Sequence, residues 1–537
     1  MLTRYLPISE LQSILSEDQL RNMAALMRRL DPTAITDPLS DRSFLSRLYD
    51  AYHGPELLHN RAHRRRLLEY LPDLELRDLS RTLSLSAEGS FAAVADRIIS
   101  LPWGANEETR QFLRFFGYSD EYLPEPLAHV PTEEAIDPIT PPLKVLHDYQ
   151  ASIFYRALEV LRAPNARFML QMPTGSGKTR TAMELIAAFL NEYPGRNVLW
   201  LAHTEELCEQ AAASFIEVWR HVGKVPVTLQ RCWGNYKPTF SKISSSLIIA
   251  GFAKLHSLNK SNAPPPSADL IIVDEAHMVL APTYAAVVDW AKAVGARIIG
   301  LSATPGRSRG GVDENSALAE FFNNQVIGIV PPNQEGVIDY LQGRGILARV
   351  EREPIYTNIT FHLSREEWQK LEEELDYPHE FLKRVAENQE RNRIIAEKLW
   401  ELSQHTIQVL VFAASVEQSR ILCALLLYRG ISAAHIDGTT STNTRRGVIA
   451  KFRRGEIRFL FNYQVLATGF DVPKIDTIFI ARPTKSIVLY SQMIGRGLRG
   501  PASGGTHRVR LVDVLDNTID YSSDLDEVYE YFNDYWK

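Results

Sequence analysis

The chain has 537 residues, of which 45% are hydrophobic and 23% are charged, which is typical of a folded globular protein with about three domains. Its formal net charge of -6 excludes nucleic-acid binding through bulk charge, so any such binding needs a local basic groove. No apolar run approaches the length that spans a bilayer, and the N-terminal residues lack the segment order of a signal peptide. These features predict a cytoplasmic protein with no membrane partner.

Cys208, Cys232 and Cys423 lie far apart and form no CxxC pair. This spacing argues against a disulfide framework and against a zinc ribbon. We expect all three to be buried apolar residues.

Residues 1–140 consist mostly of short amphipathic helical patterns broken by prolines, which predicts a separate helical N-terminal domain. Its last part, Pro124 to Pro142, is proline-rich and acidic, as is typical of a linker. The basic cluster RAHRRR, Arg61 to Arg66, could contact a phosphate backbone. A solvated helix face is the favoured interpretation, by roughly two to one.

Residues 74–98 contain two helical patterns separated by a glycine turn at Gly89. This segment resembles the SAP module, a small helix-extended-helix unit that binds DNA. Ser90, Phe91 and Ala92 stand where that family has basic residues, which argues against DNA binding here. A helical packing unit is an equally good interpretation.

From Leu143 onward, short β-branched runs alternate with helical patterns, which predicts parallel sheets covered by helices on both faces. Two series of runs predict two tandem α/β lobes, at 141–335 and 336–537. Between the series, a weaker strand pattern at Ile355–Phe361 and a charged helical segment at Arg365–Leu402 are interpreted as connector. The predicted strands are Phe168–Met172, Asn197–Leu201, Ser246–Ala250, Leu270–Val273, Arg297–Leu301, Gln408–Phe412, Ser432–Ile436, Arg458–Phe461, Thr477–Ile480 and Val509–Val512.

The stretch MPTGSGKT, Met172 to Thr179, follows an apolar run and opens a helical pattern, which predicts a phosphate-binding loop. Its glycines let backbone N–H groups turn onto phosphate oxygens, and the helix N-terminus adds partial positive charge. Lys178 can reach the β- and γ-phosphates, and Thr179 can ligate Mg²⁺. Met172 replaces the usual first glycine, and an ordinary tight turn is the alternative. The predicted nucleotide-binding residues of this loop are Pro173, Thr174, Gly175, Ser176, Gly177, Lys178 and Thr179.

A second acidic element is expected at the end of a neighbouring buried strand, because Mg²⁺ needs an oxygen ligand there. The stretch LIIVDEAH, Leu270 to His277, provides it. Asp274 would hold Mg²⁺, and Glu275 would orient the attacking water and accept its proton. The alternative is an ordinary strand end before a helix. This alternative is disfavoured because DEAH follows GSGKT at a suitable distance along the chain.

These motifs, in this order, resemble those of the superfamily 2 helicases and translocases, and within them the motor subunits of restriction enzymes and repair translocases of the RadD and UvsW type. The resemblance covers about Leu143 to Leu515. It implies two RecA-like lobes, ATP and Mg²⁺ as cofactors, and a nucleic-acid partner.

In the first lobe, the resemblance implies further roles. LHDYQ ends in Gln150, which would recognise adenine. In AHTEELCEQ, similar to motif Ia, His203 would contact the nucleic-acid backbone, while Thr204 replaces a residue that is often basic. Lys254 in GFAKL is a candidate phosphate contact of motif Ib. SATP, at 302–305, matches motif III, which links the ATP site to the nucleic-acid track.

The second lobe contains QMIGRGLR, which matches motif VI. In it, Arg496 and Arg499 would act as arginine fingers on the charge that develops during phosphoryl transfer. Gln492 would contact the γ-phosphate or the attacking water.

LATGFDVP resembles motif V of the same family. Thr468 and Gly469 would approach the strand backbone, and Asp471 would face the nucleotide.

The leading hypothesis is a DNA-directed ATPase that translocates on DNA or unwinds it, in repair or defence. An RNA helicase or remodeller is the alternative, because both polymers present phosphates. A third hypothesis is an ATP-gated binding subunit that presents its N-terminal domain to a protein partner such as a nuclease, although Glu275 and the arginine pair argue against it. The second lobe disfavours a small-molecule kinase.

Overall fold

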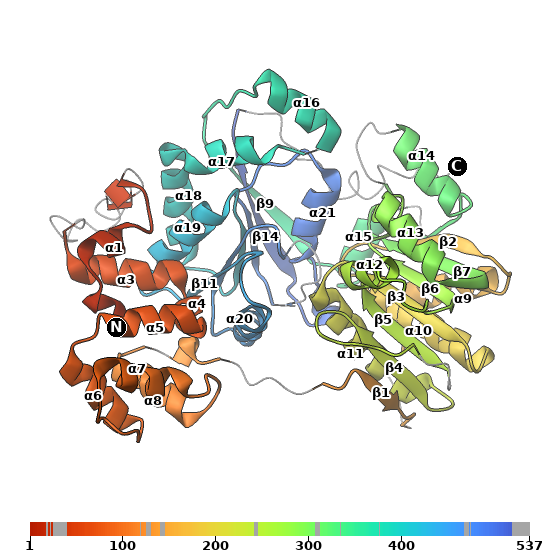
Figure 1. Cartoon of the computed structure of the whole chain (residues 1–537). Helices are drawn as coiled ribbons and strands as arrows, with labels where there is room; N and C mark the ends of the chain where they lie inside the picture. The colour runs from red at the N-terminus through yellow and green to blue at the C-terminus, as the bar shows by residue number, and fades with distance from the viewer. Residues whose placement is uncertain are drawn as a thin grey trace.

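The computed structural model describes residues 1–17, 20–21, 23–24, 40–118, 120–124, 130–139, 145–240, 245–306, 312–332, 335–374, 376–466, 472 and 474–517. An N-terminal helical domain lies against the second of two sheet-based lobes, and the second lobe lies between this domain and the first lobe (Figure 1). Among these residues, no helix has the length and apolar character that crossing a membrane requires.

The first lobe is built on one eight-stranded sheet. Its strands are β1 (Glu133–Ile136), β2 (Arg167–Gln171), β3 (Asn197–Ala202), β4 (Val227–Cys232), β5 (Ser246–Gly251), β6 (Ala268–Asp274), β7 (Lys292–Ser302) and β8 (Val326–Gly328). They lie in the order β1-β4-β5-β3-β6-β7-β2-β8, and every pair is parallel except β1–β4. The helices are α9 (Asp148–Leu161), α10 (Lys178–Glu192), α11 (Glu205–Val222), α12 (Phe252–Lys260), α13 (Pro282–Ala291), α14 (Val312–Phe321) and α15 (Val337–Gly343).

The second lobe is built on a six-stranded, fully parallel sheet. Its strands are β9 (Arg349–Tyr356), β10 (Val409–Phe412), β11 (Ala433–Ile436), β12 (Phe459–Asn462), β13 (Thr477–Ile480) and β14 (Arg508–Leu515), in the order β11-β12-β10-β13-β14-β9. The helices are α16 (Arg365–Glu374), α17 (His379–Glu387), α18 (Gln389–Leu402), α19 (Val416–Tyr428), α20 (Thr442–Arg454) and α21 (Ile487–Gly495).

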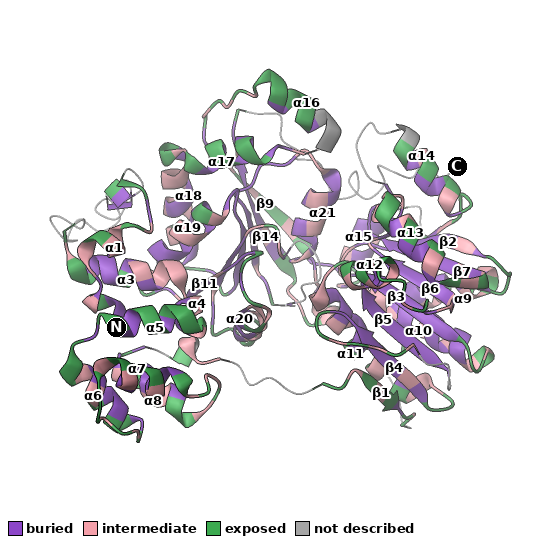
Figure 2. Cartoon of the chain, in the orientation of Figure 1, coloured by how far each residue is buried: buried purple, intermediate pink, exposed green. Residues whose placement is uncertain are grey.

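The predicted fold class, two tandem RecA-like parallel-sheet lobes after a mostly helical N-terminal region, is confirmed. Each predicted strand overlaps an observed one. The central strands are buried on both faces, as a parallel sheet between helix layers requires (Figure 2).

The structure also contains strands that the sequence patterns did not reveal. β4 and β8 were not predicted, and β9 begins at Arg349, earlier than the predicted start at Ile355. β9 is an edge strand with alternating exposure and several charges. Arg508 of β14 pairs across the strands with Glu351 at 2.6 Å. Charged edge strands lack the apolar run that marks a buried strand, which explains the misplaced start of β9.

Part of the predicted linker belongs to the first lobe. β1 lies within the proline-rich stretch and pairs antiparallel with β4. Arg231 of β4, whose side chain is 5% exposed, donates hydrogen bonds to the carbonyl of Pro131 (2.8 Å) and to Glu134 (2.7 Å). The chain is therefore anchored to the first lobe before that lobe's central strands begin.

The N-terminal domain consists of short helices, as predicted: η1 (Leu2–Tyr5), α1 (Ile8–Gln12), α3 (Arg42–His53), α4 (Glu56–His59), α5 (Arg61–Glu69), α6 (Asp73–Thr82), α7 (Phe91–Ser100), α8 (Glu107–Phe115) and η2 (Asp120–Tyr122). Its apolar core is continuous with that of the second lobe. The rings of Phe44 and Tyr428, for example, meet edge to face at 5.3 Å. The domain is thus not packed as a separate body.

One residue of the basic cluster on α5, Arg64, packs inside the N-terminal domain. Arg64 is buried, donates to the carbonyl of His59 (2.9 Å) and lies over the ring of Trp103. Burial lowers the pKa of Arg64 to about 10. Arg65 pairs with Asp96 at 2.5 Å. The predicted solvated face is therefore wrong for Arg64, because this side chain serves internal packing.

The SAP-like segment forms two helices, α6 and α7, joined by a loop that contains Gly89. Arg77 donates to the carbonyls of Ala87 (2.5 Å) and Gly89 (3.2 Å), and Arg97 donates to other loop carbonyls. These guanidinium groups close the loop, which supports the packing interpretation. All three cysteines are buried and free, as expected.

A buried ion pair in the second lobe yields a stability prediction. Arg391 of α18 bonds Asp516 at 2.8 Å, with both side chains fully buried. We expect Arg391→Ala to lower the free energy of unfolding of this lobe by about 3–5 kcal/mol, because it leaves a buried carboxylate without its partner. Urea unfolding measures this.

Arg393 is the matched control, because it lies on the same helix and pairs with partly exposed Glu390 and Glu397. Arg393→Ala should cost less than about 1 kcal/mol. Equal losses in the two variants would contradict the prediction.

Candidate active site between the lobes

The loop between β2 and α10 has the shape of a phosphate cradle. Gly175 and Gly177 have φ values of 87° and 88°, in the left-handed region that favours glycine. Ser176 is buried, and its hydroxyl donates to the carbonyl of Pro173 at 2.7 Å. Met172 is fully buried, and its N–H donates to the carbonyl of Ser302 at 3.1 Å. Met172, which replaces the first glycine of the common pattern, thus has its side chain in the core.

The two predicted carboxylates lie at the end of β6. Glu275 has a φ of 51°, and its N–H donates to Asp274 at 3.1 Å. Burial raises the pKa of Asp274 to about 6, against the opposing effect of Lys178. Burial also acts to raise the pKa of Glu275, but Lys178, His277 and Arg496 outweigh it and lower the pKa. Glu275 is therefore ionised at neutral pH and can accept a proton or hydrogen bond.

Motif VI residues reach across from the second lobe. Gln492 of α21 donates to Glu275 at 3.4 Å. Arg496 follows α21, and its charge acts on the pKa of both carboxyls. At Gly495, an added Cβ would lie 2.5 Å from the Cβ of Thr174 in the phosphate loop. The two lobes are thus in direct contact at this site.

A cavity of about 930 Å³ lies between the lobes at this site. Lys178, Thr179, Asp274 and Glu275 come from the first lobe. The described part of the chain contains no cluster of three His, Cys, Asp or Glu residues that could hold a metal. The two oxygen donors of Thr179 and Asp274 fit Mg²⁺, which takes its other ligands from phosphates and water. The second-lobe residues that line the cavity include Gly495, Arg496 and Arg499.

Gln150 lines the same cavity, and its amide bonds to the protein backbone. Its Oε1 accepts from the N–H of His147 at 3.0 Å, and its Nε2 donates to the carbonyl of Ser176 at 3.2 Å. The hydroxyl of Tyr149 donates to the same carbonyl at 2.7 Å. Gln150 therefore supports the phosphate loop, and the adenine recognition predicted from the sequence is the competing role, which the variant described below distinguishes.

The motif III residues form a closed turn after β7. Ser302 donates to the carbonyl of Thr304 at 2.6 Å, and the N–H of Thr304 donates back to Ser302 at 3.1 Å. Both residues are buried. This turn therefore lies beside the phosphate loop, which bonds to the same Ser302 through its backbone.

The predicted nucleic-acid contacts of the first lobe lie outside this cavity. The ring Nδ1 of His203 is 2.6 Å from the hydroxyl of Tyr284, which stacks on Phe252. Lys254 donates to a backbone carbonyl at 3.0 Å. Thr204 caps α11 by accepting from the N–H of residue 207. The predicted motif V residues, Thr468, Gly469 and Asp471, lie outside the described residues.

Two ion pairs between the lobes were not predicted. Arg445 of α20 bonds Glu206 of α11 at 2.9 Å, and Arg446 pairs with Glu209. Three of these residues, Glu206, Glu209 and Arg446, line the cavity. No local pattern could have revealed these pairs, because their partners are more than 230 residues apart in the chain.

Two family models match the chain. "Type III restriction enzyme, res subunit" matches residues 143–307, and "Helicase conserved C-terminal domain" matches residues 390–500. The first match contains the phosphate loop and both carboxylates, and the second contains motif VI.

Among known proteins, the chain is similar to the candidate ATP-dependent helicase IRC3 of Saccharomyces cerevisiae, at 28% identity over 66% of this chain and 49% of that protein. It is also similar to the ATP-dependent RNA helicase ROK1 of Yarrowia lipolytica, at 24% identity over 60% and 55% of the two chains. The chain thus spans about half the length of these relatives.

Among solved structures, the fold is similar to the ATP-dependent Type ISP restriction-modification enzyme LlaBIII bound to DNA. The TM-score is 0.50 at 16% identity, and the match covers 73% of this chain and 30% of that one.

The bonds of Gln150 yield a prediction about nucleotide binding. We expect Gln150→Ala to weaken ATP and GTP binding alike, by about tenfold, because it removes two hydrogen bonds that support the phosphate loop. Competition against a fluorescent nucleotide measures both affinities. Tyr149→Phe removes a bond to the same carbonyl of Ser176. It should also weaken ATP and GTP binding to the same extent. A loss confined to ATP would instead establish adenine recognition.

Proposed function

We propose that the chain, which belongs to the superfamily 2 helicases, uses ATP hydrolysis to translocate on DNA or to unwind it. As such it would be a nucleic-acid-dependent ATPase, which the matches to the "Type III restriction enzyme, res subunit" and "Helicase conserved C-terminal domain" models support. The observation that carries the proposal is the bond between Gln492 and Glu275, because it joins motif VI of the second lobe to the carboxylate at the end of β6 in the first lobe. The choice of DNA rests on the restriction-enzyme model that matches the first lobe.

In the proposed mechanism, the phosphate loop and Lys178 bind the nucleotide phosphates. Thr179 and Asp274 would hold Mg²⁺, which would supply positive charge against the phosphate oxygens. Glu275 orients the attacking water and accepts its proton, with Gln492 bonded to the same carboxylate. Arg496 adds positive charge where negative charge develops during phosphoryl transfer.

Movement along a strand would follow from opening and closing of the lobes. Hydrolysis releases the contacts between motif VI and the phosphate loop, so the two lobes can separate and close again. His203 and Lys254 of the first lobe, together with Thr468 and Gly469 of motif V, would hold the strand backbone. Contacts to phosphates predict weak sequence preference and strong salt dependence.

A second candidate function is RNA unwinding. It is favoured by the similarity to ROK1, which is named as an RNA helicase. We also propose that the N-terminal domain is the contact site for a protein partner such as a nuclease, and that the protein acts in the cytoplasm.

The polymer is tested by ATP hydrolysis with single-stranded, duplex and forked DNA and with RNA. We expect DNA to stimulate hydrolysis and RNA to have little effect. Stimulation by RNA alone would establish the second candidate. No stimulation by either polymer, with the protein folded, would contradict both functions.

The site assignment is tested by two variants. Lys178→Ala should abolish hydrolysis, because the loop loses its charge on the β- and γ-phosphates. Arg496→Ala should lower kcat by about 10³ while ATP binding is retained, because the arginine acts mainly on the transition state. Arg508→Ala, at an exposed position on β14, is the control and should hydrolyse ATP normally. Normal turnover in either site variant would refute the assignment.

A further inference from the structure

Helix α20 lies between the N-terminal domain and the first lobe (Figure 1). On one side it bonds to α4 of the N-terminal domain, and on the other it forms both ion pairs with α11. It is thus in contact with both bodies that flank the second lobe.

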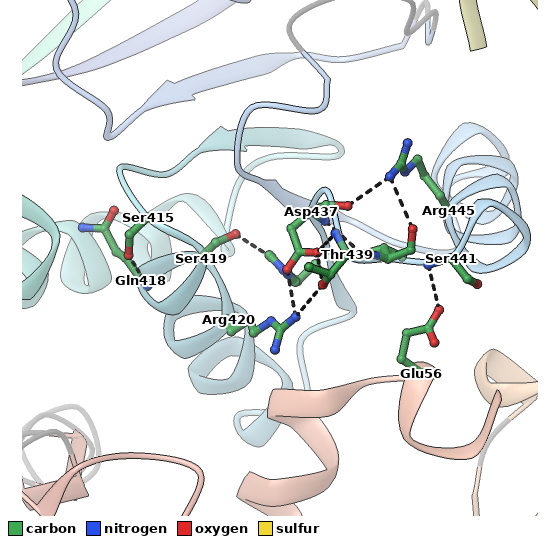
Figure 3. A network of polar contacts seen from close by, with 11 residues as sticks. Glu56, Ser415, Gln418, Ser419, Arg420, Asp437, Thr439, Ser441 and Arg445 are labelled. Atoms are coloured by element: carbon green, nitrogen blue, oxygen red, sulfur yellow. Dashed lines mark hydrogen bonds and ion pairs between the residues drawn. The ribbon is translucent and has the colours of Figure 1, made fainter. Parts of the chain in front are cut away.

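In the first ion pair, the arginine is held in place by further bonds within the second lobe. Arg445 pairs with Glu206 at 2.9 Å, and each side chain is 18% exposed. The same guanidinium also donates to the carbonyls of Asp437 (3.1 Å) and Thr440 (3.3 Å) (Figure 3). Arg445 is therefore oriented by its own lobe before it meets the first lobe.

The loop that provides these carbonyls is itself fixed. Asp437 has a fully buried side chain, accepts from the N–H groups of Thr439 (2.7 Å) and Thr440 (3.1 Å), and pairs with Arg420 at 2.8 Å. Burial acts to raise the pKa of Asp437, but bonds from His435 and Thr439 hold it well below its usual range. The carboxylate stays ionised, which favours its bonds to Arg420 and to the N–H groups of Thr439 and Thr440.

The N-terminal domain caps the start of α20. Glu56 accepts from the N–H of Ser441, the N-cap residue, at 3.1 Å (Figure 3). His59 bonds to the hydroxyl of Thr444 at 2.9 Å and to the carbonyl of Tyr122 at 3.0 Å. A carbonyl only accepts, so Nε2 carries the proton and Nδ1 accepts from Thr444. Burial lowers the pKa of His59, which favours this neutral form.

The other end of the path reaches the ATP site. Helix α11 packs on α10, which begins at Lys178. Glu206, Glu209 and Arg446 line the cavity that also contains Lys178 and Arg496. Because α20 and the arginine fingers belong to the same lobe, a shift of that lobe at α20 relative to α11 would also change how the fingers face the phosphate loop.

We propose that α20 is a positioning element for ATP hydrolysis. The N-terminal domain fixes α20, and Arg445 and Arg446 then hold α11 so that the two halves of the ATP site close in register. The proposal rests on the function given above. It assigns Arg446, Glu206 and Glu209 to the closing of the site, and Glu56 and His59 to the orientation of α20.

Closure can be measured directly, without nucleic acid or turnover. Glu192→Cys and Gln404→Cys place fluorescent labels at exposed positions on the two lobes, and the native cysteines are all buried. Energy transfer between the labels, titrated with a non-hydrolysable ATP analogue, gives the nucleotide concentration at half-closure. ATP hydrolysis gives KM and kcat for the same variants.

The pair Arg446–Glu209 is suited to a charge swap. Arg445 would lose its bonds to the carbonyls of Asp437 and Thr440, whereas none of the bonds described above joins Arg446 to its own lobe. We expect Glu209→Arg and Arg446→Glu each to raise the half-closure concentration and KM by about tenfold, as loss of a charged hydrogen bond does. The value of kcat should stay near that of the unchanged chain. The double swap should restore closure to within about twofold, since it restores the attraction.

The N-terminal contribution is tested by Glu56→Gln combined with His59→Phe. We expect this variant to raise the half-closure concentration in the same direction as the single swaps. Asp96→Asn, which removes an exposed pair elsewhere in the same domain, is the control and should close normally.

Unchanged closure in the single swaps, or no recovery in the double swap, would overturn the role of α20. Unchanged closure in the Glu56 and His59 variant would overturn the role of the N-terminal domain. If the protein without substitutions binds nucleotide and does not close, the proposal and the proposed function both fail. If the protein without substitutions closes and hydrolyses ATP, and the variants close at the same nucleotide concentration, only the proposal fails.

Discussion

The close approach of Gly495 to Thr174 is the constraint on which the rest of the site depends. A side chain at residue 495 would collide with the phosphate loop. The second lobe can therefore approach the first this closely only with glycine at this position. This approach allows Gln492 to bond Glu275 and places Arg496 near both carboxylates. Each lobe alone holds half of the groups for phosphoryl transfer, and hydrolysis is thereby tied to the relative position of the lobes.

The second lobe shares buried apolar clusters with both of its neighbours. Toward the N-terminal domain it shares a continuous buried apolar core, which is costly to separate because apolar surface would be exposed to water. Toward the first lobe, a buried apolar cluster again includes residues of both lobes. Around α20, partly exposed ion pairs are added to it, and such pairs are weak in water. β1 is fixed to the first lobe by its pairing with β4.

The sequence predicts the central strands well, and its predictions of the phosphate loop and the carboxylates have the same basis, because each depends on neighbouring residues. Gly175 and Gly177 need left-handed backbone, and buried strands need apolar runs. The edge strands β1 and β9 were missed or misplaced, because their charged residues face water and lack that pattern. The pair Arg445–Glu206 could not be predicted, because it depends on how two lobes meet and not on any local pattern.

The walls of the cavity also carry charges of opposite sign, which explains why nucleotide should promote closure. The charged lining residues of the second lobe are all arginines, whereas carboxylates outnumber cations in the first-lobe lining. A bound nucleotide adds negative phosphates to the first-lobe wall, so attraction to the facing arginines increases as the lobes approach. Loss of the γ-phosphate removes part of that charge, and the same electrostatics then favours reopening. The charged lining residues are, in the first lobe, Lys178, Arg180, Glu206, Glu209, Glu217, Asp274 and Glu275, and in the second, Arg446, Arg453, Arg496 and Arg499.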